Sequence, residues 1–407
     1  MTDLRDMRAA AGRGGLRRRI GPGLLVLYGI GVMIGAGIYV LVGAVAGEAG
    51  LWAPLAFLLA GLVALPSALS YGELSARIPE SAGEAAFVHA ATGMRGLAWL
   101  TGLAIALIGI VSAAAILQGG VGYLAGLVAL PEALLLALLL ALLVGAALAG
   151  VLESLALAGL FTLIEVGGLL MVAGAGLAAP PAAGWADLPP LGTALPGLAG
   201  AALLAFFAYL GFEDMVNMAE ETIAPERTMP RAILMALAVT ALIYMLVALA
   251  AVRAVPVAQL AGSERPLALV MAAGWPAGVA LLSAIAVVAA LNGVLAQIVM
   301  AARVLYGLGA RHGGPAVLAR VDPRRGTPVV ATLGVGALVL VLALAVPLEA
   351  LAEATSALLL AVFMAVNGSL IALRRQPAPA RGMFRAPSWA PWAGLMLSAL
   401  TLGLGMV

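Results

Sequence analysis

Several residue types that carry chemistry in other proteins are absent or scarce in this chain of 407 residues. There is no cysteine, which excludes disulfides, thiol catalysis and cysteine metal sites. The two histidines, His89 and His312, lie far apart in the sequence, so a histidine metal cluster is not expected. The chain also lacks the H-E-x-x-H and G-x-S-x-G motifs of metal and serine hydrolases. We therefore expect neither an enzyme nor a bound cofactor.

Charge is scarce as well, and apolar residues dominate. Only 10% of the residues are charged, the formal charge of +2 carries no nucleic-acid signal, and all basic residues are arginine. By contrast, 64% of the residues are hydrophobic and the mean hydropathy is +1.14. A soluble chain of this length could not bury so much apolar surface, so the sequence predicts an all-α polytopic membrane protein with lipid as its solvent.

About eleven apolar runs are long enough to cross a bilayer as helices. They are residues 22–47, 51–74, 96–124, 131–152, 155–179, 195–219, 231–255, 275–308, 328–347, 350–373 and 388–407. With residues 1–21 as a cytoplasmic tail, only Arg253 and Arg265 fall in external loops. This asymmetry follows the positive-inside rule and predicts a cytoplasmic N-terminus in the inner membrane.

Glycines interrupt two of these runs at matching places. Residues 34–38 read Ile-Gly-Ala-Gly-Ile, and residues 206–213 contain Gly211. Glycine weakens a helix interior by about 1 kcal/mol relative to alanine. The two interruptions lie five spans apart, so residues 22–179 and 195–373 would run in opposite senses, with 388–407 as an additional helix. This is the geometry of an inverted repeat, whose broken helices form the binding site of many secondary transporters.

The two interruptions offer complementary charges. A helix restarting near Gly37 would present free backbone N–H groups and a positive dipole end, which suit a carboxylate. A helix ending near Phe207 would present carbonyl oxygens, which suit a cation. For a single Gly-Ala-Gly, small-residue packing between helices is the favoured explanation. Two interruptions together favour a clamp for a zwitterion such as a free amino acid.

Six short segments form a series along the chain: residues 34–38, 71–81, 206–213, 220–231, 302–307 and 384–387. In this order they resemble motifs of the amino acid–polyamine–organocation permeases. The matching motifs are the broken first helix, the end of the second helix with its loop, the unwound sixth helix, the loop after it, the end of the eighth helix and the approach to the eleventh. Their number and order make the resemblance specific.

The resemblance implies a five-plus-five inverted-repeat fold with discontinuous first and sixth helices and alternating access. Carried over by position, the residues that receive the substrate carboxylate would be Ile34, Gly35, Ala36 and Gly37. The carbonyls that receive the ammonium would be those of Phe207, Ala208 and Leu210. Weaker candidates for the pocket wall are Met33, Ile110, Tyr209, Phe212 and Asn292. Ala36 stands where many members carry Ser or Thr, so one hydroxyl contact is missing.

Acidic residues inside spans are costly, at about 2.5–3.5 kcal/mol near a helix centre. Glu165 lies in the middle of a span, at a position where related permeases can carry a lysine that faces the ion site between the first and eighth helices. We predict that Glu165 couples transport to protons; a structural carboxylate bonded to the broken first helix is the equal alternative. For Glu213, gating or coupling is favoured over capping of the second half-helix.

Together these features predict secondary active transport of amino acids, with proton-coupled uptake as the leading mode. The alternative is an exchanger of amino acids or polyamines for basic substrates, since Glu165, Glu213 and Asp214 could receive a basic side chain. The spans are too uniformly apolar for a channel. The expected partners are an amino acid, protons and membrane lipid.

Overall fold

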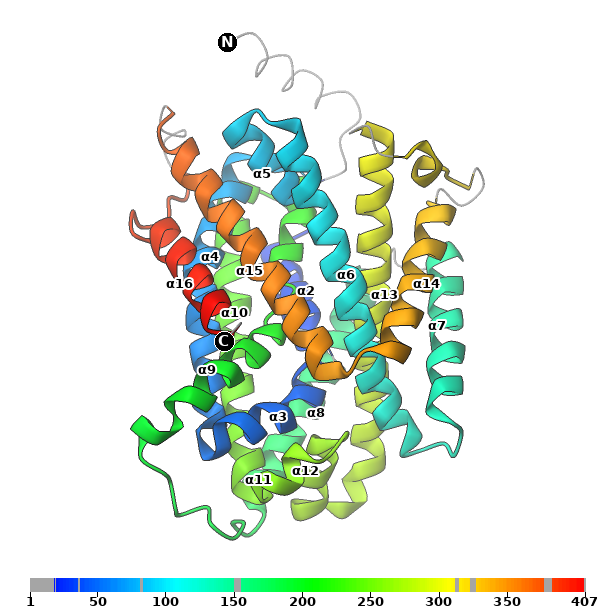
Figure 1. Cartoon of the computed structure of the whole chain (residues 1–407), viewed down its shortest axis with the longest axis vertical. Coiled ribbons are helices and arrows are strands. Elements are labelled where there is room, and N and C mark those ends of the chain that lie inside the picture. Colours follow the sequence, from blue (N-terminus) through cyan, green and yellow to red (C-terminus); the bar gives the residue numbers. More distant parts are fainter. Residues whose placement is uncertain are drawn as a thin grey trace.

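The computed structural model of the chain describes residue 18 and residues 20–35, 37–80, 83–149, 155–311, 315–322, 327–376 and 383–405. Within these residues the regular elements are helices, and one isolated bridge joins Ile20 to Thr222. Many of the long helices run roughly along the longest axis of the molecule (Figure 1). The predicted all-α polytopic membrane fold is confirmed.

Each predicted span has a helical counterpart in the described part of the chain. In chain order these are α2 (Pro22–Ile34) with α3 (Gly37–Ala49), α4 (Ala53–Arg77), α6 (Arg95–Ala125), α7 (Glu132–Ala149), α8 (Leu155–Ala178), α9 (Leu191–Phe207) with η2 (Glu213–Glu221), α10 (Pro225–Ala254), α13 (Val279–Arg311), α14 (Val329–Ala345), α15 (Leu348–Leu373) and α16 (Ala390–Gly405). By length and composition, seven helical stretches of the described residues can cross a membrane, and four shorter apolar helices accompany them.

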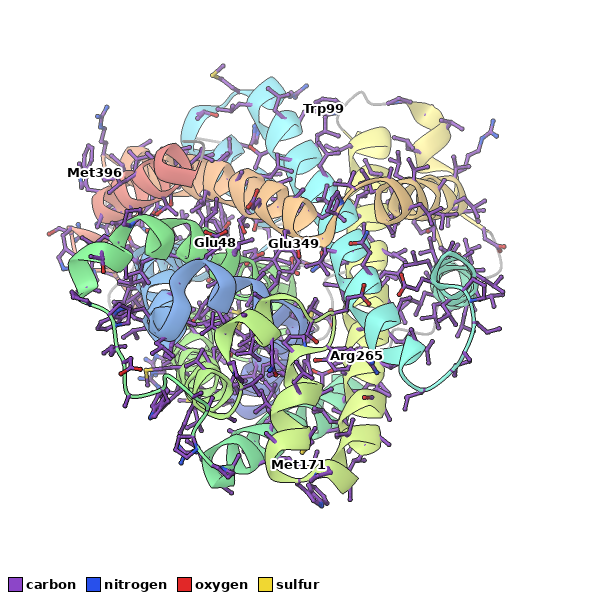
Figure 2. All side chains as sticks on the ribbon, turned by 60° about the horizontal axis from the view of Figure 1, so that its bottom comes forward. Glu48, Trp99, Met171, Arg265, Glu349 and Met396 are labelled. Carbon is purple, nitrogen blue, oxygen red and sulfur yellow. The ribbon has the colours of Figure 1, made fainter. Side chains whose placement is uncertain are left out.

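Short helices cover the two ends of the bundle. One end carries α5 (Gly83–Thr92), and the 3₁₀ helix η4 (Ala316–Ala319) lies there too (Figure 1). The opposite end carries α11 (Val257–Ala261) and α12 (Pro266–Gly274), and the 3₁₀ turns η1 (Gly50–Trp52) and η3 (Pro276–Gly278) complete the described elements. Arg265 lies at this second end, which faces the viewer in Figure 2. The predicted cytoplasmic N-terminus stays a prediction.

The two predicted helix interruptions are present. The first helix ends at Ile34 and restarts at Gly37, and Gly35 between them has φ +21°. Helix α9, in the sixth predicted span, ends at Phe207. Turns that contain Gly211, at φ +120°, then lead to η2. Here the structure differs from the expected α-helical restart, because residues 213–221 form a 3₁₀ helix. Glycine accepts such backbone angles without the strain that a Cβ would add.

The two broken spans lie side by side and antiparallel. The backbone N–H of Ile20 donates to Glu221 O at 3.0 Å, and Ile223 N–H donates to Ile20 O at 3.0 Å. These bonds place the beginning of α2 beside the end of η2, while α3 packs on α9. The opposite directions of the two broken spans agree with an inverted repeat, although the repeat over whole halves remains a prediction.

A buried carboxylate joins three segments at the α5 end of the bundle. Glu73 on α4 is fully buried and accepts hydrogen bonds from the guanidinium groups of Arg77 and Arg374. The N–H of Ala386 adds a third bond of 2.9 Å. Because Arg374 follows α15 and Ala386 precedes α16, this network fixes α4 to both neighbours.

Candidate functional site

The two interruptions meet in the middle of the described bundle, and glycine makes the contact possible. A Cβ added to Gly37 would lie 3.1 Å from Ala208 Cα. A Cβ added to Gly211 would lie 2.6 Å from Val32 Cγ1 and 2.9 Å from the Val32 carbonyl carbon. Ordinary carbon contacts are about 3.5–4.0 Å. Backbone of each broken span therefore packs directly on backbone of the other.

Tyr244 on α10 joins the two interruptions through one hydroxyl. Its oxygen lies 2.6 Å from Met33 O and 2.7 Å from Ala208 O, and the ring is fully buried. Both carbonyls belong to the C-terminal ends of half-helices, where the helix dipole is negative. A phenol has a single proton to donate, so the two carbonyls share it. Sequence analysis missed Tyr244; its only signal was a hydroxyl in the middle of a very apolar span.

The predicted carboxylate site is only partly free in this conformation. Gly35 N–H donates to Gly31 O at 3.1 Å and so closes the last turn of α2. Free amides belong instead to the first turn of α3, which begins at Gly37. Ile34 is fully buried at the end of α2. Ala36, also predicted to bind the carboxylate, lies outside the described residues.

Two of the three predicted ammonium acceptors already have partners within the protein. Phe207 O accepts the N–H of Leu210 at 3.1 Å, and Ala208 O accepts from Tyr244. A carbonyl oxygen has two lone pairs, so each can still accept one bond from a ligand. Tyr209 turns its hydroxyl away from the carbonyls and donates to Phe57 O on α4 at 2.8 Å. These bonds fix the turn between α9 and η2.

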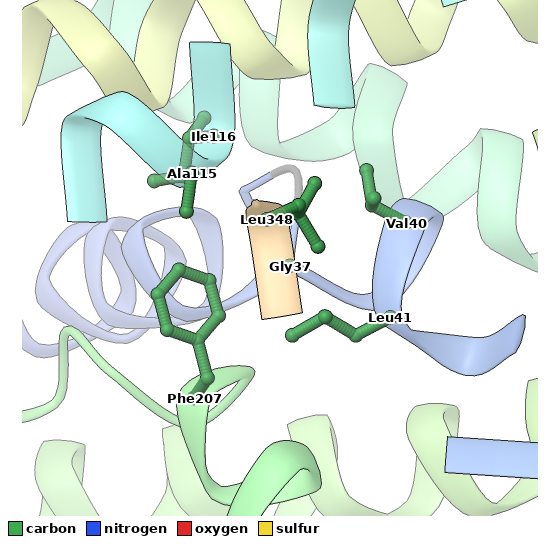
Figure 3. Close-up of a pocket in the computed structure, with 7 residues that line it drawn as sticks. All are labelled: Gly37, Val40, Leu41, Ala115, Ile116, Phe207 and Leu348. Atoms are coloured by element: carbon green, nitrogen blue, oxygen red, sulfur yellow. The ribbon is translucent and has the colours of Figure 1, made fainter. Parts of the chain in front are cut away.

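A small apolar cavity lies beside the two interruptions (Figure 3). The centre of a water molecule can move within about 10 Å³ of it, which is about the room needed for one water. The residues that line the cavity are Gly37, Val40, Leu41, Ala115, Ile116, Phe207 and Leu348. Of these, only Gly37 and Phe207 were predicted. The cavity is far smaller than an amino acid, so no substrate fits it in this conformation, which we call the closed conformation.

Other predicted wall residues pack elsewhere. Ile110 and Asn292 do not line the cavity. Phe212 is fully buried and stacks edge-on against Tyr71 at a centroid distance of 5.7 Å. It also packs on Phe363 of α15 at 5.2 Å. This aromatic cluster lies between η2, α4 and α15.

Glu165 is fully buried on α8 and faces the broken first span and α13. Asn292 Nδ2 donates to Glu165 Oε1 at 3.4 Å, while Oε2 is buried without a hydrogen-bond partner. The Tyr39 hydroxyl on α3 donates to the main-chain oxygen of Glu165 at 2.9 Å. Neither ion pair recorded in the described part involves Glu165. The carboxyl thus contacts α13 rather than the first helix, and the first helix bonds only its backbone.

Glu213 supports the second interruption directly. Its Oε2 accepts the N–H of Gly211, two residues before η2 begins, at 3.0 Å, so it braces the turn that leads into that helix. Its neighbour Asp214 accepts a bond of 3.3 Å from Gln297 Nε2 on α13. Both acids are more than nine-tenths buried.

The known proteins that this chain resembles are permeases and transporters. A family model described as amino acid permease matches residues 25–407. The chain is 31% identical to a branched-chain amino acid permease of Bacillus subtilis, over 98% of this chain and 90% of that protein. It is 30% identical to vacuolar cationic amino acid transporter 4 of Arabidopsis thaliana, over 87% of this chain but only 62% of the plant protein. It is 29% identical to a methylthioribose transporter of Bacillus subtilis, over 89% of this chain and 82% of that protein.

Proposed function

This chain belongs to the amino acid permease family, and we propose that it carries amino acids into the cell across the cytoplasmic membrane by alternating access. The family and these relatives are transporters and not enzymes. The observation that carries the proposal is the meeting of the two interruptions, where Gly37 packs on Ala208 and Gly211 packs on Val32. A solute bound there touches both broken spans at once.

The chemistry of this meeting point suits the two charges of an amino acid. Amide groups at the start of α3, together with Ile34, Gly35 and Ala36, would bind the carboxylate. The carbonyls of Phe207, Ala208 and Leu210 would bind the ammonium at the negative end of α9. Residues 22–179 and 195–373 form the two inverted repeats in this proposal, so each charge of the substrate is held by a different repeat.

The cavity favours a neutral aliphatic side chain. Its lining presents only apolar side chains, from α3, α6, α9 and α15. A branched-chain permease is among the relatives and is matched over nearly its whole length. The second candidate is an exchanger for basic amino acids, which the buried acids Glu165, Glu213 and Asp214 and the plant cationic transporters favour. We put the neutral substrate first because the lining is apolar.

Glu165 is the proposed coupling residue. A buried carboxylate without a cationic partner is expensive, so the group favours a bound proton in the closed conformation. Its free oxygen and its contact with Asn292 connect α8 to α13, beside the first span. Movement of the first span relative to α13 would change the environment of this carboxyl group and therefore its affinity for the proton.

Purified protein in liposomes tests the proposal. We expect an inside-alkaline pH gradient to drive accumulation of labelled leucine, and valine and isoleucine to compete better than lysine or arginine. Glu165→Gln should abolish gradient-driven accumulation but keep counterflow exchange, whereas Glu353→Gln, at an exposed site on α15, should behave as the native chain. Absence of counterflow for all amino acids would refute the carrier. Unchanged accumulation by Glu165→Gln would refute its coupling role.

A further inference from the structure

Three buried carboxyl groups converge where α5 meets η2. Glu84 lies in the first turn of α5, and Glu213 and Asp214 begin η2; their exposed fractions are 4%, 3% and 8%. The two elements are in direct contact, because a Cβ added to Gly83 would lie 2.9 Å from the side-chain oxygen of Asn217 and 3.2 Å from Val216. Glu84, the next residue, therefore lies at the contact between α5 and η2.

No ion pair to these acids is recorded in the described part of the chain. Arg303 of α13 acts on Tyr28 of α2, as Glu213 and Asp214 do, but does not pair with either acid. Both recorded ion pairs there belong to Glu73. The ionisable groups that act on Glu84 are Asp214 of η2 and Tyr71 of α4, and Glu213 interacts with both acids. The flanking helices α6 and α15 add no further such group among the described residues. Three ionised carboxylates in one buried space would repel one another and lose their hydration, so the cluster requires protons.

One buried polar atom beside these acids lacks a hydrogen-bond donor. Gln297 is 2% exposed, and its Oε1 is buried without a donor although its Nε2 donates to Asp214. The fully buried hydroxyl of Tyr71 interacts with all three acids, with Glu84 first among them. An acceptor without a donor beside a carboxyl group indicates a proton on that carboxyl. The described residues contain no group of acids or histidines arranged to hold a metal ion.

We propose that Glu84, Glu213 and Asp214 form a second proton-binding site, separate from Glu165, and that a proton bound there holds α5 on η2 and keeps this end of the transporter closed. When the proton leaves to the solution on this side, repulsion between the carboxylates drives Glu84 into water. The short helix α5 then moves off η2. This step rests on the proposed function, for which it supplies the opening of the cytoplasmic side.

The pKa of Glu84 agrees with this proposal both in the direction of its shift and in the pH range. Burial, followed by the charge of Asp214, raises the pKa of Glu84 from 4.5 to about 7, against the lowering effect of its hydrogen bonds. A released Glu84 in water regains its ordinary pKa, so the closed state binds the proton more tightly. Closure is therefore favoured at low pH and is lost as the pH rises through about 7. With these two pKa values, the closing equilibrium weakens about tenfold between pH 6 and pH 8.

Because the native chain has no cysteine, a single introduced thiol can report the opening. Val216→Cys places it at a fully buried position under α5, and Met94→Cys provides an exposed reference at a residue that is 60% exposed. Both variants are labelled with a membrane-impermeant maleimide in nanodiscs without substrate. The rate for Val216→Cys, divided by that of the reference, should rise about tenfold from pH 6 to pH 8.

Further variants separate titration from folding. Adding Glu84→Gln to Val216→Cys should remove the rise in labelling rate with pH, whereas adding Glu84→Asp should keep a rise. Adding Glu80→Gln, just before α5, should leave the rise unchanged. A constant rate ratio in the Val216→Cys protein, or an unchanged rise with Glu84→Gln, would overturn the proposal. The assay needs no substrate, so a failure of amino acid transport is detected separately by the counterflow experiment.

Discussion

Replacing Gly211 by alanine tests whether close packing of the two interruptions is essential. A residue with a Cβ at φ +120° is strained by about 1–3 kcal/mol. The new Cβ would also lie 2.6 Å from Val32 Cγ1 and 2.9 Å from the Val32 carbonyl carbon, and such overpacking costs about 1–3 kcal/mol more. The closed conformation should therefore lose about 2–6 kcal/mol, which weakens its equilibrium at least about thirtyfold.

The assay measures leucine counterflow in liposomes together with thermal unfolding in detergent. We expect Gly211→Ala to unfold at a lower temperature and to transport at least tenfold more slowly. Gly174→Ala is the matched control: nothing lies within 4 Å of its added Cβ, in the interior of α8, and alanine there favours the helix by up to about 1 kcal/mol. This control should transport normally.

A second substitution makes the test specific. Val32→Ala in the Gly211→Ala background removes the Cγ1 contact but leaves the backbone contact at 2.9 Å, so it should restore transport in part. Native rates and native unfolding temperature in Gly211→Ala would refute the reasoning. So would a loss of transport that Val32→Ala does not relieve at all.

Three other predictions concern residues around this contact. Tyr244→Phe keeps the ring but deprives two carbonyls of their donor, which should cost about 1–3 kcal/mol; the maximal rate of uptake should fall more than the KM rises. Glu73→Ala leaves Arg77 and Arg374 without their carboxylate and should destabilise the protein by about 3–5 kcal/mol, as measured by thermal unfolding, whereas Glu80→Ala should have little effect. Leu348→Ala enlarges the cavity and should improve the competition of phenylalanine against leucine in uptake.

The sequence alone predicted the parts of the fold that depend on local physics. The span positions follow from the length of the apolar runs. The interruption at Gly35 follows from two nearby glycines, because glycine is unfavourable in the interior of a helix. Gly211 could be placed for the same reason, in a turn that only glycine enters without strain. The 3₁₀ form of η2 was not predictable, because it depends on how Glu213 bonds to Gly211 N–H and how α5 packs above it.

The parts that depend on contacts between distant segments were missed. Tyr244 stands alone in an apolar helix, and only the fold brings it to carbonyls from two other spans. Leu348 and Ile116 line the cavity from α15 and α6, yet each looks like any lipid-facing or core residue in the sequence. Glu84 likewise becomes notable only when α5 folds onto η2. The two backbone interruptions were thus predictable, whereas the side chains that other helices bring to them were not.

The pairing of Ile20 with the stretch around Thr222 has a mechanical consequence. The chain ahead of the first span is fastened to the loop behind the sixth, so neither can swing outward by itself while those two backbone bonds persist. A spectroscopic label attached near Arg18 would therefore report displacement of a loop some two hundred residues downstream.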